Sequence, residues 1–112
     1  MIVVAKNKEN FFKYGVYDLK KKKLVIDTLY LRINDLNKNI CVVSKMDKRN
    51  RDYTSTLLNI PQNKLLYPFD KLSVAYKLED FYIIKDTLSY SISYILNDEG
   101  QVLFKDKTER IP

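Results

Sequence analysis

A short apolar segment that ends in lysine recurs along the chain at a nearly constant interval. The segment Val3–Lys6 recurs as Val42–Lys45 and again as Tyr82–Lys85. A polar patch follows each copy and leads to a tyrosine, and the three tyrosines are Tyr14, Tyr53 and Tyr94. Self-similarity at a period of roughly 20–50 residues is typical of repeat architectures. The sequence therefore predicts three degenerate units of about 40 residues.

The apolar runs inside these units have the length and composition of β-strands. They are short and rich in Val, Ile, Leu, Tyr and Phe, residues that favour strands. Asn97–Gly100 is typical of a hairpin turn, because glycine tolerates positive φ and Asn and Asp bond to nearby backbone. Alternation in the third unit predicts a half-buried strand with Tyr90, Ile92 and Tyr94 on one face. We expect a mainly β fold of antiparallel meander or hairpin repeats, either open or closed as a small barrel or trefoil-like structure.

Two segments also have apolar spacing that suits a short helix. In residues 28–37 the apolar side chains of Leu29, Ile33 and Leu36 recur at helical intervals, and residues 69–79 show a similar pattern. We expect each segment to form one or two helical turns or an irregular strand.

Several motifs resemble elements of the WG-repeat family, also called KWG repeats. They are Lys13–Asp18, with its Tyr-Gly pair, Tyr30–Ile33, Phe69–Leu72 and Ile95–Val102. The resemblance covers the chain from Ile2 to Ile111. It implies a mainly antiparallel β repeat protein with a binding role, and it carries over no catalytic residues.

Composition removes the common catalytic devices. The chain has no histidine, one cysteine, and two glycines, Gly15 and Gly100, that lie far apart in the sequence. A structural zinc site, a histidine relay and a glycine-rich phosphate loop all need residues that are missing. Asp70, Glu79 and Lys85 only loosely imitate a metal-nuclease motif. We expect no catalytic residues, no cofactor and no metal site, and we expect Cys41 to be a small buried core residue.

The positive charge is concentrated in the first part of the chain. The formal net charge is +6, but residues 1–64 carry 14 Lys/Arg against 6 Asp/Glu, whereas residues 65–112 carry 6 against 8. Two basic stretches stand out, Lys20–Lys23 and Lys45–Arg51, and together they could form one basic rim. We expect the partner-binding residues there to be Lys20, Lys21, Lys22, Lys23, Lys45, Lys48, Arg49, Arg51 and Tyr53.

A basic β domain without catalytic groups is expected to act by binding. The leading interpretation is a non-catalytic protein–protein interaction with a partner that has an acidic surface. One concrete form is an inhibitor of a host defence complex, encoded by a phage or mobile element. The alternative is a module that binds DNA or RNA through its basic, tyrosine-bearing surface. Pairing of an edge strand would also allow a homodimer.

The sequence offers no membrane segment. The first apolar run, Ile2–Ala5, is shorter than the roughly 7–15 residues of a signal-peptide core. No apolar run approaches the roughly 20 residues that a membrane-spanning helix needs. We therefore expect a single domain over residues 1–112, located in the cytoplasm, or in the host cytoplasm if a phage encodes it, without membrane contact.

Overall fold

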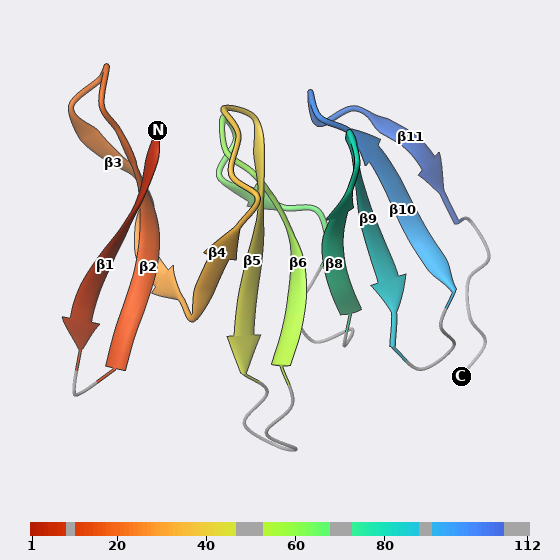
Figure 1. Cartoon of the computed structure of the whole chain (residues 1–112), viewed down its shortest axis with the longest axis horizontal. Coiled ribbons are helices and arrows are strands. Elements are labelled where there is room, and N and C mark those ends of the chain that lie inside the picture. The colour runs from red at the N-terminus through yellow and green to blue at the C-terminus, as the bar shows by residue number, and fades with distance from the viewer. Residues whose placement is uncertain (9–10, 47–52, 68–72, 88–90, 107–112) are drawn as a thin grey trace.

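In the computed structural model, the regular elements of the described residues are β-strands that form three antiparallel sheets (Figure 1). The structure describes residues 1–8, 11–46, 53–67, 73–87 and 91–106. Sheet 1 contains β1 (Ile2–Lys8), β2 (Phe11–Asp18) and β3 (Lys23–Tyr30). Sheet 2 contains β4 (Arg32–Asn34), β5 (Ile40–Met46), β6 (Tyr53–Asn59) and β7 (Lys64–Leu65). Sheet 3 contains β8 (Ser73–Leu78), β9 (Phe81–Asp86), β10 (Ile92–Asn97) and β11 (Val102–Lys105).

The mainly β, antiparallel fold expected from the sequence is confirmed. Within the described ranges no sheet closes on itself, so neither a barrel nor a trefoil forms, and the sheets follow one another along the longest dimension of the molecule (Figure 1). The central hairpins of the three sheets are β1–β2, β5–β6 and β9–β10, which begin at Ile2, Ile40 and Phe81. None of the described segments is a helix long and apolar enough for a membrane crossing.

The strand pairing corrects one detail of the sequence pattern. Tyr14 pairs with Ala5 and Tyr94 pairs with Ile84, at the same place in the two hairpins. In the middle hairpin that place belongs to Ser55, which pairs with Ser44, and Tyr53 lies two residues nearer the connection. The three connections differ in length, so equal spacing of tyrosines in the sequence does not give equal register. Descent of the three units from one repeated sequence stays a prediction.

Of the two forms expected for residues 28–37 and 69–79, their described parts adopt the strand alternative and not the short helices. Residues 28–37 contain the end of β3, all of β4 and a turn, and residues 73–78 form β8. Ile33 pairs with Val43 in a strand ladder, while Leu29 remains 50% exposed. Apolar spacing over so few residues does not separate a helix from a bent strand, and the ladder with β5 decides the conformation.

An irregularity in β10 overturns the expected face of another strand. A register shift lies between Ile92, which pairs with Lys85, and Tyr94, which pairs with Ile84. Since Lys85 and Ile84 are successive residues of β9, they point to opposite faces of the sheet. Ile92 and Tyr94 therefore do not share a face, and Tyr90 lies outside the described residues.

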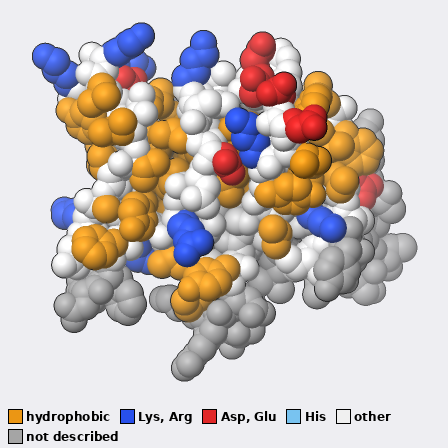
Figure 2. All heavy atoms as spheres, in the orientation of Figure 1, with side chains coloured by type: hydrophobic (Ala, Val, Ile, Leu, Met, Phe, Trp, Pro, Cys, Tyr) orange, Lys and Arg blue, Asp and Glu red, His pale blue; other side chains and the backbone are white. Residues whose placement is uncertain are grey.

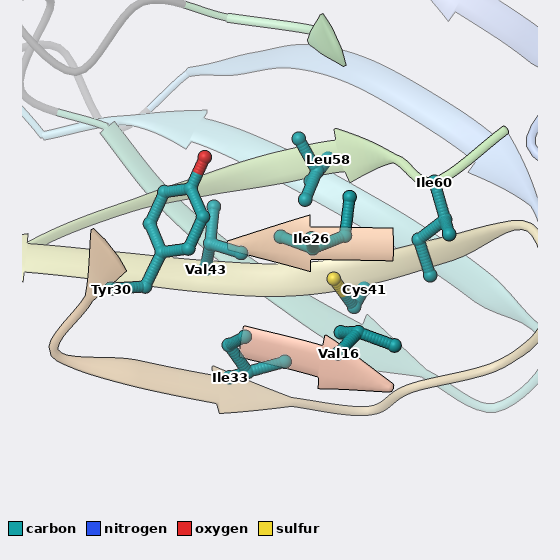
Figure 3. Packing of buried hydrophobic residues seen from close by; sticks show 8 residues of the cluster. All are labelled: Val16, Ile26, Tyr30, Ile33, Cys41, Val43, Leu58 and Ile60. Carbon is teal, nitrogen blue, oxygen red and sulfur yellow. The ribbon is translucent and has the colours of Figure 1, made fainter. Parts of the chain in front are cut away.

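Sheet 2 is the middle layer and is buried on both sides. Ile40–Ser44 in β5 is buried without interruption. Alternate side chains serve opposite faces: Cys41 and Val43 join a cluster with sheet 1, whereas Ile40 and Val42 join a cluster with sheet 3. The expectation that Cys41 is a buried core residue is confirmed. Figure 3 shows the cluster between sheets 1 and 2, formed by Val16, Ile26, Tyr30, Ile33, Cys41, Val43, Leu58 and Ile60.

Hydrogen bonds connect sheets 2 and 3 beside their shared apolar cluster. Where β6 and β8 begin, the Thr54 hydroxyl donates to the Ser73 carbonyl at 3.1 Å and accepts from the Ser73 amide at 3.2 Å. The Ser73 hydroxyl donates to the Ser55 carbonyl at 2.7 Å, and the Ser55 hydroxyl accepts from the Ala75 amide at 2.7 Å. These side chains extend the pairing of sheet 2 onto the edge of sheet 3.

The other end of the same interface is joined through Asn37 and Tyr82. The Tyr82 hydroxyl donates to the Asp35 carbonyl at 2.7 Å, and the Asn37 side-chain amide donates to the Asp98 carbonyl at 2.9 Å. The Asn37 side-chain oxygen also accepts from the Ile40 amide at 2.8 Å, which fixes the turn before β5. Asn37 thus ties a turn of sheet 2 to a turn of sheet 3.

Candidate binding groove

An open groove runs between sheets 1 and 2. It consists of two adjoining hollows of about 280 and 240 Å³ that share Tyr14 and Arg32. The first hollow is completed by Val3, Ile33 and Asn34, and the second by Phe12, Leu31 and Tyr53. We call these eight residues the aromatic groove.

Elementary strand geometry brings the groove residues together. Phe12 and Tyr14 lie four and two residues before the core residue Val16 on β2, so all three share the face toward sheet 2. The Leu31 amide donates to the Ser44 carbonyl at 3.0 Å, which holds the corner between β3 and β4. This corner brings Arg32 into the same groove as the two aromatic rings.

The chemistry of the groove is that of a cation among aromatic rings. The Arg32 side chain makes no hydrogen bond or ion pair with the described residues. The rings of Phe12 and Tyr53 are 57% and 63% exposed, while Tyr14 is half-buried. An arginine can bind a carboxylate through two parallel hydrogen bonds and can also stack on an aromatic face. Over the lower ends of sheets 1 and 2, Figure 2 shows hydrophobic side chains beside basic ones.

A separate hollow of about 480 Å³, which we call the lysine-lined hollow, lies at the opposite end of the same two sheets. Lys21, Lys23 and Lys38 line it, and none of the three forms an ion pair with a described residue. The Asp18 carboxylate accepts hydrogen bonds from the backbone amides of Lys20 and Lys21 at 2.9 and 3.1 Å. The Lys21 amide, as the largest cause, lowers the pKa of Asp18. The Asp18 carboxylate therefore holds the turn through two backbone amides, and the lysine side chains remain available to a partner.

The structure separates the two basic stretches for which the sequence allowed one common rim. Lys20–Lys23 lies in the turn between β2 and β3, at the upper edge in Figure 1, whereas Lys45 and Tyr53 lie near the lower ends of β5 and β6. These residues therefore do not form one continuous surface. The Lys45 ammonium lies 5.9 Å from the centre of the Tyr30 ring, a cation–π contact.

Only part of the expected binding set can be placed. Lys48, Arg49 and Arg51 lie outside the described residues. Of the expected residues, Tyr53 lines the aromatic groove, and Lys21 and Lys23 line the lysine-lined hollow.

Of the eight residues of the aromatic groove, sequence reasoning identified only Tyr53 as a binding candidate, and the missed residues include Phe12, Tyr14 and Arg32. The spacing of the two rings from Val16 was a usable signal, because alternate residues of a strand share a face. Arg32 offered no such signal, since it reaches the rings only through the corner between two sheets.

Neither a metal site nor a reactive thiol stands out in the described part of the chain. No group of three or more potential metal ligands occurs there. Burial raises the pKa of the Cys41 thiol to about 12, so the thiolate that would act as a nucleophile is disfavoured.

Comparisons with known proteins leave the geometry as the basis for assigning function. No family model matches the chain, and neither does any curated protein or solved structure.

Proposed function

We propose that the protein is a non-catalytic binding protein whose aromatic groove holds an extended segment of a partner protein. The observation that carries this proposal is Arg32, which lines a hollow with the exposed rings of Phe12 and Tyr53 and has no partner among the described residues. Arg and Tyr are among the residues that most often dominate protein–protein binding energy, especially in pockets that become dry on binding. The partner segment would place an acidic side chain on Arg32 and apolar or aromatic side chains beside it.

The lining of the groove favours a protein segment over a nucleic acid. Arg32 is the single cation among the described residues that line it, and Val3, Phe12, Leu31 and Ile33 contribute apolar surface beside the polar groups of Arg32, Asn34 and the two tyrosines. Binding to a nucleic acid depends on several cations that follow the phosphate backbone. A peptide needs only one carboxylate–guanidinium pair and apolar pockets, which is the composition observed.

The basic first part of the chain would help to attract such a partner. Complementary charge mainly raises the association rate and the selectivity of an interface. An inhibitor encoded by a phage or mobile element could use the groove to occupy an acidic segment of a host defence complex. We place this binding in the cytoplasm, where a free thiol such as Cys41 persists.

Selection of random peptides on the immobilised protein tests the proposal without a known partner. We expect enriched peptides to combine Asp or Glu with aromatic or aliphatic residues. Arg32→Ala should weaken their binding about 30-fold, the equivalent of the roughly 2 kcal/mol that an anchoring arginine contributes. Lys64→Ala, which removes an exposed positive charge on β7 away from the groove, should leave binding unchanged.

Two outcomes would count against a protein-binding groove. One is the absence of enriched peptides, or enrichment that Arg32→Ala does not affect. The other is binding to a 20-nucleotide oligo(dT) or oligo(U) at about 50 mM salt that weakens steeply with added salt, since that pattern marks phosphate contacts. The second outcome would support the nucleic-acid alternative, for which the exposed rings would serve as stacking platforms.

A further inference from the structure

The outer face of sheet 3, which points away from sheet 2, is almost entirely apolar at its described positions. The pairs Tyr76–Ile83, Ile83–Ile95 and Ile95–Phe104 form a row across all four strands, opposite in facing to the core residues Tyr82 and Ile84. Two neighbouring rows each cross three strands, and they contain Val74, Lys85 and Ile92 in one row and Leu78, Phe81 and Asn97 in the other. The exposed members are 38–55% accessible, namely Val74, Leu78, Phe81, Ile92 and Phe104.

The outer face of sheet 1 differs in charge. There Lys6 pairs directly with Lys13, on the face opposite to Val16. Like charges placed opposite each other in a sheet repel and retain water. Among the ladder-paired residues of the described outer face of sheet 3 only Lys85 is charged, and it lies between Val74 and Ile92. Sheet 3 is therefore the end of the molecule that can lose its water on association.

We propose that the outer face of sheet 3 binds the same face of a second copy of this chain. Three strands of six residues and one of four, spaced about 4.8 Å apart with a rise of about 3.3 Å per residue, give a footprint of roughly 350 Å² before side-chain relief is counted. Two such faces contribute roughly 700–1,000 Å² once side-chain relief is counted, which is the size of a weak, transient interface. A contiguous apolar patch of this size is among the largest that soluble monomers expose, and such patches are often functional.

Self-pairing of sheet 3 fits better than stacking of sheet 3 on sheet 1 of another copy. Head-to-tail stacking would bury Lys6 and Lys13 together with Lys85, three ammonium groups, whereas self-pairing buries only Lys85 of each copy. Burial of unpaired charge is costly. Pairing of the two sheet-3 faces forms a closed twofold dimer, the commonest symmetry of soluble oligomers. Such a dimer leaves the aromatic groove, between sheets 1 and 2, open in both copies.

Sedimentation velocity of the full chain between about 1 and 200 μM tests the dimer over the affinities expected of a small interface. The wild type should change from monomer to dimer across this range. The double substitution Phe81→Glu and Phe104→Glu places two carboxylates on the face and should weaken dimerisation at least about 100-fold. The control, Leu24→Glu and Leu29→Glu, makes the same change at exposed positions of sheet 1 and should dimerise like the wild type.

Circular dichroism establishes that each variant is folded before its mass is interpreted. A wild type that stays monomeric at about 200 μM overturns the proposal. A Phe81→Glu/Phe104→Glu variant that is folded and still dimeric overturns it as well. Loss of the dimer only in the sheet-1 variant would overturn it by assigning the interface to the other end of the molecule. None of these results depends on the ligand of the aromatic groove.

Discussion

The two interfaces that sheet 2 makes differ in their polar ends rather than in their apolar centres. Each centre is a cluster of buried aliphatic side chains with one buried tyrosine, Tyr30 or Tyr82. The interface with sheet 3 is hydrogen-bonded at one end by Thr54 and Ser73 and at the other by Asn37. The interface with sheet 1 ends in the aromatic groove on one side and the lysine-lined hollow on the other.

This difference indicates how a small stacked-sheet protein divides structure from function. Apolar burial holds both outer sheets on sheet 2, because it is the main favourable term in folding. Side-chain hydrogen bonds then fix sheet 3, and the rim between sheets 1 and 2 remains available to a partner. Binding and catalytic surfaces generally come from such less strongly fixed regions.

The largest expected effects separate the two apolar centres. Leu57 and Leu58 are adjacent on β6, are 0% and 1% exposed, and point to sheets 3 and 1 respectively. Leu57→Ala should cost about 4 kcal/mol of unfolding free energy and Leu58→Ala about 3 kcal/mol, because the open interface can relax around a cavity. Urea denaturation of the two variants measures the difference. A larger loss for Leu58→Ala would show that the interface with sheet 1 is the more rigid one.

A second pair of substitutions isolates the hydroxyl bonds. Thr54→Val leaves the buried Ser73 amide without its acceptor and should cost about 1–3 kcal/mol. Thr56→Val is the matched control two residues along β6, because the Thr56 hydroxyl is buried without a hydrogen-bond partner in the described structure. That change should be neutral or stabilising by up to about 1 kcal/mol. Equal losses in the two variants, measured by thermal unfolding, would remove Thr54 as a link between the sheets.

The smallest expected effect concerns the thiol in the interface with sheet 1. Burial raises the pKa of Cys41 from 9.0 to about 12. The stability from burying the neutral thiol is therefore fully present below pH 9 and is lost progressively as pH rises toward 12, because only the unfolded chain deprotonates in that range. At pH 10 the loss should be about 1 kcal/mol.

Urea denaturation of the wild type and of Cys41→Ala between pH 8 and about pH 10.5 checks this linkage. The pKa values of Tyr30 and Tyr82 are also raised by burial, but both tyrosines remain in the variant. Cys41 contributes to both raised values, so the difference in slope between the two proteins reports the Cys41 thiol together with its electrostatic effect on the two tyrosines. Identical pH slopes would mean that the thiol already ionises in the folded state, as an exposed group would.

The sequence was sufficient to predict strands, their antiparallel pairing and the buried thiol, because these depend on local apolar runs. The turn at Asn97–Gly100 also forms as expected, with φ of 87° at Gly100 and its amide donating to the Asn97 carbonyl at 3.0 Å. Residues 28–37 were ambiguous, since Ile33 is committed to a strand only by pairing with Val43.

The candidate site could be predicted only in part for a related reason. Tyr53 was identified by its neighbours in the sequence, whereas Arg32 meets Phe12 and Tyr14 through the packing of two sheets. The separation of Lys20–Lys23 from Lys45 depends on strand direction, which places consecutive turns at opposite ends of the sheets. Charge counts along the chain contain no information about that separation.

Native-state hydrogen exchange followed by NMR tests most directly whether sheet 1 is the less firmly held layer. Amides of β2 and β3 should exchange through a partial opening of lower free energy than global unfolding. Amides of β9, together with the Ser73 and Ala75 amides bonded to β6, should exchange only with global unfolding. Equal opening free energies for sheets 1 and 3, or a lower value for sheet 3, would contradict the division between an open and a fixed interface.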